Sequence, residues 1–355
     1  MKPSIGAMVV NFNGGEKLLR CVAALKKQSR RLRDIVVVDN GSTDDSLERV
    51  RAEIPGLRII ELGENRGLPF ARNVGMRELS TDLVLSVDSD IYLEPSCLAE
   101  MERAHGERQA AVVCPRILLW PDRTVVHCDG ASVHFTGMMA LRHAFRPVGA
   151  LARSGALVGA VPGGCLLFDR EGALAVGGFE DLFFFYSEDL EWSLKLRTRG
   201  HRLYCEPAAV VHHDRGEGTP GLSFRGRRPY PVRRAYLSMR NRWMTMLIHY
   251  RIRTMIVLLP ALLAYEMGTL GIAIVRKWLG AWTRAWWWLL VHRRAVRDRR
   301  RRAQNARTVR DRDLLEGGPI PFTPGFVRSR IGRAVLVSLS AGLNLYWKMA
   351  RRYIG

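Results

Sequence analysis

Short apolar runs alternate with segments of helical spacing in the first ninety residues, and this alternation limits the fold more than any other feature of the chain. The apolar runs cover residues 5–10, 34–38, 57–62 and 83–87, and the segments between them repeat apolar residues every three or four positions. Strands joined by helices run parallel, because each helix returns the chain to the same edge of the sheet. The sequence therefore predicts an α/β fold, a Rossmann-like, mostly parallel sheet with flanking helices.

Two aspartates follow the last of these runs. Residues 83–90 read LVLSVDSD, so Asp88 and Asp90 come directly after a buried strand, at the edge where ligands of parallel sheets bind. Side chains two positions apart in an extended chain point the same way, and two carboxylates aimed at one spot repel each other unless a cation lies there. Oxygen ligands suit Mg²⁺ or Mn²⁺, which we therefore expect; for an Asp-x-Asp taken alone, a solvated turn is the alternative.

Polar residues follow the other predicted strands as well. Asp39 ends the second strand, and the loop ENRGLPFARNVG, residues 64–75, precedes the last one. Gly67 permits a close backbone approach, the proline after it suits a first helical turn, and Arg72 and Asn73 then fall in that turn. Such an arginine is a suitable diphosphate contact, with a solvated helix charge as the alternative. The sequence contains neither a Walker loop nor a GxGxxG after the first strand.

An acidic cluster, SEDLE at residues 187–191, follows the aromatic run FFFY. Glu188 and Asp189 open a segment of helical spacing that Gly200 ends. Capping of that helix is the alternative interpretation, but capping needs only one acid and leaves the aromatic residues unexplained. Burial against aromatic rings raises the pKa of a carboxyl and makes it a better base near neutral pH. We therefore expect a general base in this cluster.

These motifs occur together in a fixed order: VVNFNGG, VVVDNGSTDDS, ENRGLPFARNVG, VDSD, GGF and YSEDLEWSLKLRTRG. Over residues 4–245 the chain resembles glycosyltransferase family 2, and within it the bacterial rhamnosyltransferases of O-antigen and capsule assembly. The resemblance implies a GT-A fold, a nucleotide-diphosphate sugar donor (a UDP- or dTDP-sugar), a divalent metal, and inversion of the anomeric centre. Glu180-Asp181 and Glu191 depart from the usual family pattern without changing the charge, which leaves the acceptor open.

The resemblance also implies roles for single residues. Asp189 would be the base that activates the acceptor hydroxyl, with Glu188 as runner-up. Asp90 would bind the metal that neutralises charge on the leaving diphosphate. His212, at the end of an apolar run, would be a second metal ligand, with His213 less favoured and an ordinary surface or core histidine as the alternative.

The remaining implied roles concern the two substrates. Asp39 would contact the nucleotide base or ribose, and Asp88 the ribose. The residues that would bind the nucleotide sugar are Asn11, Asn13, Asp39, Asn40, Asn65, Gly67, Arg72, Asn73, Asp88 and Ser89. The residues that would face the acceptor or donor sugar are Gly164, Phe179, Trp192 and Arg197; for Arg197, a last-turn helix arginine is an equal alternative.

The C-terminal part has a different composition. Residues 255–275 form an apolar stretch long enough to span a bilayer, five tryptophans follow it at 278–288, and residues 293–302 contain seven arginines. Basic residues flank the apolar stretch on both sides, which argues against one crossing. We expect a GT-A catalytic domain over 1–245 and a membrane-associating helical region over 246–355, lying in the plane or as a hairpin; a single span and a soluble helical core are the alternatives.

Net charge limits the partners. The chain of 355 residues carries a formal charge of +21, which predicts an anionic partner such as a phosphorylated substrate or a membrane surface. A basic nucleic-acid-binding protein is the alternative, but no RNP, KH, zinc or helix-turn-helix signature supports it, so we expect no nucleic acid. A nucleotidyltransferase would need a basic glycine-rich loop after the first strand, where NFNGGEK matches poorly.

The surroundings in which the protein works follow from weaker signals. Six cysteines show no CxxC pair, which is typical of reduced cytosolic thiols, and the first ten residues contain no long apolar run, so we expect no signal peptide. Residues 217–234, rich in Gly, Pro and Arg, are expected to form a loop that orders on substrate. Together with the resemblance, these features predict a lipid-linked or glycan acceptor and a place on the cytoplasmic face of the bacterial inner membrane.

Overall fold

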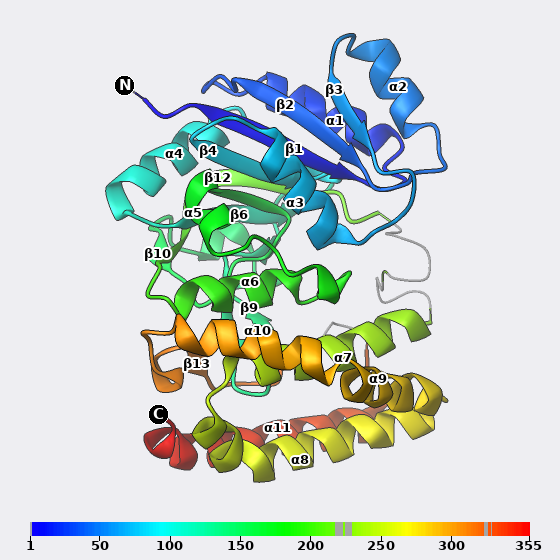
Figure 1. The fold of residues 1–355 in the computed structure, drawn as a ribbon, viewed down its shortest axis with the longest axis vertical. Coiled ribbons are helices and arrows are strands. Elements are labelled where there is room, and N and C mark those ends of the chain that lie inside the picture. Colours follow the sequence, from blue (N-terminus) through cyan, green and yellow to red (C-terminus); the bar gives the residue numbers. More distant parts are fainter. Residues whose placement is uncertain (1, 217–222, 224–228, 323–325, 328) are drawn as a thin grey trace. The chain divides into compact units, whose positions relative to one another are not determined.

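The computed structural model describes residues 2–216, 223, 229–322, 326–327 and 329–355 (Figure 1). The loop expected over residues 217–234 lies largely outside the described residues.

The chain forms two compact units, which we call the sheet unit and the helical unit. The sheet unit comprises Met1–Ala131, Leu141–Leu196 and His201–Gly216, and the helical unit comprises Ser132–Ala140, Arg197–Gly200 and Glu217–Gly355. The predicted domain boundary between residues 245 and 246 stays a prediction.

The first half of the sheet unit alternates strands and helices, as the sequence predicts. Its elements are β1 (Ile5–Asn11), α1 (Glu16–Lys26), β2 (Asp34–Asp39), α2 (Ser46–Glu53), β3 (Arg58–Glu61), α3 (Leu68–Glu78) and β4 (Leu83–Asp88). β1 pairs in parallel with both β2 and β4, and β2 pairs in parallel with β3. All seven residues of β1 are buried, which is typical of a central strand covered on both faces.

The second half of the sheet unit mixes strand directions. Its elements are β5 (Ile91–Leu93), α4 (Cys97–Arg108), β6 (Val112–Leu119), β7 (Val126–Cys128), η1 (Val148–Ala150), β10 (Ala156–Leu157), β11 (Cys165–Asp169), α5 (Arg170–Ala175), η2 (Asp181–Phe183), α6 (Glu188–Arg197) and β12 (Leu203–His213). β11 lies antiparallel between β4 and β6, and β12 runs parallel to β6. The α/β sheet with flanking helices is thus confirmed, with antiparallel strands added in its second half.

Strand register decides which polar residues meet. Asn11 lies beside Asp39 at the ends of β1 and β2, and Val10 lies beside Asp88 at the end of β4. The carboxyl ends of these three parallel strands therefore share one edge. β5 starts directly after Asp90 and pairs antiparallel with the end of β12. This pairing brings the histidines at the end of β12 to the same edge.

The described residues of the helical unit form five long helices and a small sheet of β13, β8 and β9. Its elements are β8 (Ala131–His134), β9 (Met138–Leu141), α7 (Val232–His249), α8 (Ile252–Val275), α9 (Leu279–Val291), α10 (Arg293–Asn305), η3 (Asp311–Asp313), β13 (Leu315–Glu316), α11 (Arg330–Ala350) and η4 (Arg351–Tyr353). Of the helices in the described part of the chain, α8 is long and apolar enough to cross a membrane, with a mean hydropathy of 1.8.

Candidate active site

Asp39 organises the turn that follows β2. Its buried carboxylate accepts hydrogen bonds from the backbone N–H groups of Gly41 (3.2 Å) and Ser42 (2.9 Å), from the Ser42 hydroxyl (2.5 Å) and from Asn11 Nδ2 (2.8 Å). Gly41 has φ of 79°, and a Cβ there would lie 2.6 Å from the backbone of Glu64. The turn therefore requires both the aspartate and the glycine, and it fixes the loop against the segment before α3.

Asparagines fasten the neighbouring loops to one another. Asn40 Nδ2 donates to Asn65 Oδ1 (3.1 Å), and the Asn65 oxygen also accepts from the N–H of Gly67 (3.1 Å). Asn13 Oδ1 accepts from the N–H of Thr43 (2.8 Å). Side-chain amides of this kind replace backbone pairing where a loop has none. The expected donor-binding asparagines thus lie together at the carboxyl edge, and they shape it.

Arg72 links this edge to the acidic cluster. Its guanidinium is 1% exposed, and it donates to Asp88 Oδ1 (2.8 Å), to Glu188 Oε1 (3.4 Å) and to the carbonyl of Gly163 (2.8 Å). Asp88 ends β4 and Glu188 starts α6, so one buried cation holds two elements that are a hundred residues apart in the sequence. Burial raises the pKa of Asp88, while Arg72 opposes that shift.

The two carboxyls of the acidic cluster have different surroundings. Asp189 is only partly buried, and it accepts from the N–H groups of Gly163 (3.1 Å) and Leu190 (2.8 Å). Glu188 is buried, and its Oε2 has no donor among the described residues. Burial, together with the charge of Asp189, raises the pKa of Glu188 to about 8, and burial also raises the pKa of Asp189. At pH 7 Glu188 therefore holds its proton. Asp189 is the carboxyl of the cluster that can accept a proton from another molecule.

A strained loop sets the position of the cluster. Phe184, Tyr186 and Ser187 have φ of 61°, 69° and 62°, values that non-glycine residues rarely adopt. The Phe184 carbonyl accepts from the N–H of Leu68 (2.8 Å), directly beside Gly67. A Cβ on Gly67 would lie 2.7 Å from that carbonyl oxygen. The close backbone approach that the sequence indicates at Gly67 is therefore an approach to Phe184.

Asp90 lies beside His213, and the structure does not bring His212 to it. His213 Nε2 is 3.3 Å from Asp90 Oδ2, whereas His212 Nε2 is 3.0 Å from Glu94 Oε1. Neighbouring residues of a strand point to opposite faces, so only one of the two histidines can face Asp90. The sequence preference for His212 is corrected here, because register and not motif order decides which histidine points to the edge.

Sequence reasoning missed two further groups at this place. His127, on β7, has its Nδ1 3.0 Å from Nδ1 of His213. Asp214 accepts from the hydroxyl of Tyr92 (2.9 Å) and pairs with Lys17 (3.4 Å). Asp214 comes two residues after His212 in the motif HHD, so the sequence contains a signal that points to it. His127 lies in a segment whose fold the sequence left open, so no pattern pointed to it.

Four residues that the sequence predicts at the substrates make hydrogen bonds or packing contacts within the protein. Asn73 brackets the loop after α5, donating to the carbonyl of Phe179 (2.8 Å) and to Asp181 (2.7 Å). Phe179 and Trp192 are buried and stack on each other with ring centroids 4.5 Å apart, so the expectation that they face the acceptor is corrected: both are core residues. Arg197 belongs to the helical unit, where it donates to the carbonyl of Asp313.

The other two expected residues lie at the edge. The carbonyl of Gly164 accepts from the N–H of Asp88 (2.9 Å), and the N–H of Ser89 donates to the carbonyl of Val10 (3.3 Å). A Cβ on Gly14 would lie 3.2 Å from the hydroxyl of Ser89, which places that hydroxyl against the loop after β1. Both residues therefore adjoin the two aspartates.

The side chains at Asp90 fit a divalent metal whose remaining ligands come from a bound substrate. Within the described residues there is no group of three or more His, Cys, Asp or Glu side chains that could hold a metal. Asp90 and His213 supply one oxygen and one nitrogen, 3.3 Å apart. Mg²⁺ in kinase, ATPase and polymerase sites is bound through one or two carboxylates together with substrate phosphates and water, and an imidazole nitrogen is a further ligand suited to transition-metal ions. Two protein ligands are sufficient for such a site.

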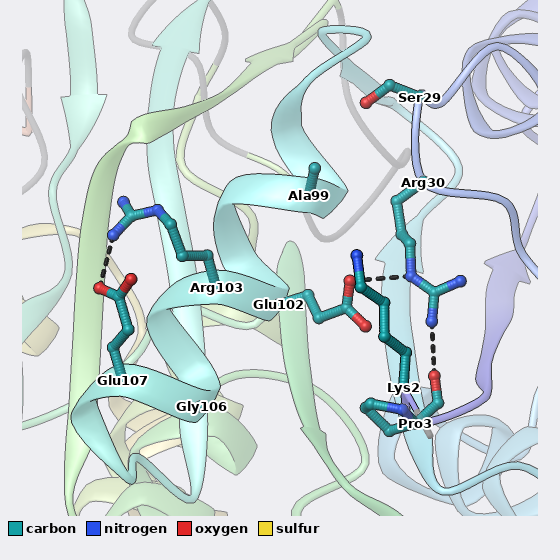
Figure 2. A pocket seen from close by; sticks show the side chains of 9 residues that line it. All are labelled: Lys2, Pro3, Ser29, Arg30, Ala99, Glu102, Arg103, Gly106 and Glu107. Carbon is teal, nitrogen blue, oxygen red and sulfur yellow. Dashed lines mark hydrogen bonds and ion pairs between the residues drawn. The ribbon is translucent and has the colours of Figure 1, made fainter.

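A surface pocket elsewhere in the sheet unit does not belong to this site. It has a volume of about 520 Å³ and is lined by residues of α4 and by Lys2, Pro3, Ser29 and Arg30 (Figure 2). Arg30 is paired with Glu102 (2.8 Å) and bonded to the carbonyl of Pro3. Pro3 precedes β1, so the pocket lies at the amino ends of the strands, opposite the edge that holds Asp88.

Comparisons with known proteins agree on one family. The model described as "Glycosyl transferase family 2" matches residues 7–126, and the model described as "Glycosyl transferase family group 2" matches residues 83–295. An N-acetylglucosaminyl-diphospho-decaprenol L-rhamnosyltransferase of Mycobacterium tuberculosis is 26% identical over 236 residues, covering 60% of this chain and 77% of the relative. A poly-beta-1,6-N-acetyl-D-glucosamine synthase of Staphylococcus aureus is 27% identical over 204 residues, covering 55% and 45%.

A solved structure shows the same fold. The crystal structure of GalNAc-T7 with UDP, GalNAc and Mn²⁺ aligns with a TM-score of 0.58 and 16% sequence identity, over 78% of this chain and 53% of that one. This chain therefore spans about half the length of that protein.

Replacing Gly67 by alanine should lower stability more than replacing Gly63 by alanine. Both glycines have positive φ, of 94° and 75°, so alanine is strained at both positions, and Gly67, with ψ of 153°, lies in a backbone region that essentially only glycine adopts. Only at Gly67 would the new Cβ meet the Phe184 carbonyl, because nothing lies within 4 Å at Gly63. Thermal unfolding followed by circular dichroism measures the difference. Equal Tm values for the two variants would show that the contact with Phe184 contributes nothing.

The buried Glu188 should make the protein less stable as the pH rises. The folded state keeps the proton of Glu188 up to about pH 8, while the unfolded chain releases it near the ordinary pKa of 4.5. Between these values the folded state binds more protons, so the free energy of unfolding falls with rising pH. In Glu188→Gln this part of the decline should disappear in urea unfolding across that range. The exposed Glu64→Gln serves as the control, and an unchanged slope in Glu188→Gln would contradict the expectation.

Proposed function

Because this chain belongs to glycosyl transferase family 2, we propose that it moves a sugar from a nucleotide-diphosphate donor to a lipid-linked glycan, with inversion of the anomeric centre and with the help of a divalent metal. The chain is a glycosyl-transfer enzyme, and its sheet unit has the GT-A fold. What the proposal adds is the identity of the substrates, the metal and the residues that act on them.

The observation that carries the proposal is the convergence around Arg72. This buried cation joins Asp88, which neighbours the metal-binding aspartate, to Glu188, which neighbours the base. The end of β4, where the sugar donor would bind, and the acidic start of α6 are thereby held at one edge of the sheet. A site that must bring a sugar donor and an activated hydroxyl together needs such a fixed arrangement.

Asp90 and His213 are the residues that would hold the metal, and Mg²⁺ or Mn²⁺ bound there would act as a Lewis acid toward the donor's diphosphate. The UDP and Mn²⁺ named for GalNAc-T7 support a nucleotide-diphosphate donor with such an ion. Asn11, at the same edge, has a buried Oδ1 without a donor among the described residues. This oxygen is available to an N–H or O–H of a bound UDP- or dTDP-sugar.

Asp189 is the proposed base. Its carboxylate takes the proton of the acceptor hydroxyl as the hydroxyl oxygen bonds to the anomeric carbon and the bond from that carbon to the diphosphate oxygen breaks. The electron pair of that bond leaves with the diphosphate, and attack from the opposite face inverts the centre. The N–H groups of Gly163 and Leu190 orient the carboxylate, and its partial burial raises its pKa toward the pH at which a base works best.

His127 is proposed to orient His213. Two Nδ1 atoms 3.0 Å apart require one to donate and the other to accept. When His213 donates from Nδ1, its Nε2 carries the lone pair toward Asp90 and suits a metal. A partner of this kind fixes the tautomer of a metal-binding histidine.

The acceptor and its location come from the relatives and the composition. The name of the Mycobacterium tuberculosis relative describes rhamnose transfer to a sugar on decaprenyl diphosphate. We propose a similar lipid-linked acceptor for this chain, within cell-surface polysaccharide synthesis, and hence a place at the cytoplasmic face of the bacterial inner membrane. The family assignment disfavours the two other classes that the sequence left open, a nucleic-acid-binding protein and a nucleotidyltransferase.

Asp189→Asn should abolish transfer, and Glu188→Gln should preserve it. The amide cannot accept the acceptor's proton, so the rate should fall about 100-fold or more, whereas Glu188 is already neutral at pH 7. The assay measures release of nucleoside diphosphate from a panel of UDP- and dTDP-sugars with Mg²⁺ or Mn²⁺ and a polyprenyl-diphosphate sugar. Full activity in Asp189→Asn together with loss in Glu188→Gln would move the base role to Glu188.

His213→Ala should weaken Mn²⁺ binding, and His212→Ala should not, because only His213 faces Asp90. His127→Ala should weaken it about 10-fold to 100-fold through the orientation of His213. Electron paramagnetic resonance of Mn²⁺ with UDP present measures binding separately from turnover. Asp90→Asn is the positive control. A loss in His212→Ala with none in His213→Ala would overturn the assignment.

A further inference from the structure

The exposed face of α8 is apolar over nearly its whole length. From Ile256 to the end of the helix, every exposed residue is apolar or glycine. The large side chains of this stretch are between 48% and 81% exposed: Ile256, Leu259, Leu263, Met267, Ile274 and Val275. A helix on the surface of a water-soluble domain shows charged residues on its outer face. This face is therefore adapted to a solvent other than water.

Beyond the exposed Arg253 in its first turn, α8 has no exposed polar side chain: Thr254 and Glu266 are buried, and Thr269 is partly buried. Glu266 accepts from Nε1 of Trp243 on α7 (2.8 Å) and from Nε1 of Trp282 on α9 (2.7 Å), and it pairs with Arg242 of α7. Thr254 is buried on the same face. The normal distribution of a surface helix is thus inverted, with polar groups inside the protein and apolar groups outside.

α11 extends the same surface. It runs antiparallel to α8, since Gly268 lies against Leu339, and Tyr346 donates to the carbonyl of Val257 (2.6 Å) (Figure 1). The large exposed apolar residues of α11 are 53% to 80% accessible: Ile331, Val335, Val337, Leu345 and Met349. Two adjacent helices with exposed apolar faces form a patch, and a continuous patch of this kind marks a binding surface. We call it the α8–α11 face.

Exposed cations stand at both ends of the α8–α11 face. One end carries Arg253, Lys348, Arg351 and Arg352, and the other carries Arg276, Lys277, Arg330 and Arg333. Two hydrogen bonds confirm these groupings, from Arg253 to the carbonyl of Tyr353 (2.9 Å) and from Arg276 to the carbonyl of Phe326 (2.7 Å). An apolar strip with positive charges at its two ends is complementary to an anionic membrane surface.

We propose that the α8–α11 face docks the protein in the plane of an anionic lipid bilayer, with its apolar side chains among the upper acyl chains and its terminal cations on lipid phosphates. The inference goes beyond the proposed reaction and rests on no donor or acceptor. A crossing by α8 would carry the Glu266–Arg242 pair and part of α7 into hydrocarbon, and it would place one cluster of cations on each side. In-plane docking keeps both clusters at one headgroup layer.

A second copy of the chain fits this face poorly. Because both ends are basic, stacking two copies along their helices places cations against cations in either direction. Anionic headgroups neutralise both ends at once. The bilayer is therefore the occupant that the charges favour.

The test is sedimentation of the full chain with vesicles of phosphatidylcholine, alone or mixed with phosphatidylglycerol. The double variant Ile256→Asp/Leu263→Asp should bind the mixed vesicles at least about tenfold more weakly, since at each site a charge replaces a leucine-sized side chain that docking would transfer into the acyl chains. The matched control is Leu157→Asp in the sheet unit, because Leu157 and Leu263 are both 53% exposed. Replacing Arg330 and Arg333 by glutamine should weaken binding to the mixed vesicles and reduce the salt dependence of that binding.

Three results would overturn the inference. The first is equal vesicle binding by the wild type and the double variant. The second is retention of the wild type in membranes after alkaline carbonate extraction, which marks a crossing helix. The third is a dimer in lipid-free solution that the double variant converts to a monomer without any change in vesicle binding. Nucleoside diphosphate release in detergent should stay unchanged in the double variant, so loss of docking is distinguishable from loss of the enzyme.

Discussion

The buried guanidinium of Arg72 is the interaction on which the site depends. A guanidinium that is 1% exposed requires a counter-charge and acceptors for its N–H groups, and it finds the charge of Asp88 and a carboxyl oxygen of Glu188 in two distant parts of the chain. Removing Asp88 would leave the buried charge uncompensated, and removing Glu188 would take away an acceptor, so this arginine holds the end of β4 and the start of α6 together. The loop at Phe184–Ser187 is strained because it must make two contacts at once. It packs against Gly67, and it places Glu188 beside Arg72.

Each of the two acids after that loop has a task that its surroundings permit. Glu188 is enclosed, keeps its proton at neutral pH and accepts from Arg72 without adding a full charge to a buried site. Asp189, one residue later, reaches partial exposure and is oriented by two backbone N–H groups. One step along the start of a helix thus separates an enclosed carboxyl from the one that we propose as the base, by the same burial effect acting to different extents.

Polar and apolar side chains are distributed differently in the helical unit and in the sheet unit. In the sheet unit, apolar residues are inside and polar residues gather at the strand ends. In α8 the polar Glu266 is inside, bonded to two tryptophans, and the large side chains of the outer face are apolar. Such an inversion is unstable in water unless something covers the outer face. The proposed contact of the α8–α11 face with lipid accounts for this composition.

The sequence alone determined the alternating strands and helices, the aspartates at the strand ends and the family, because these depend on local periodicity and on motifs that are contiguous in the chain. It also predicted a base in the cluster at Glu188–Asp189, and this assignment stays a prediction. Only the tertiary structure decided that His213 and not His212 faces Asp90, that His127 lies beside it, and that Phe179 and Trp192 pack inside the core. Those facts depend on strand register and on which face of an element meets which neighbour, and a register that shifts by one residue exchanges the two faces without changing the sequence.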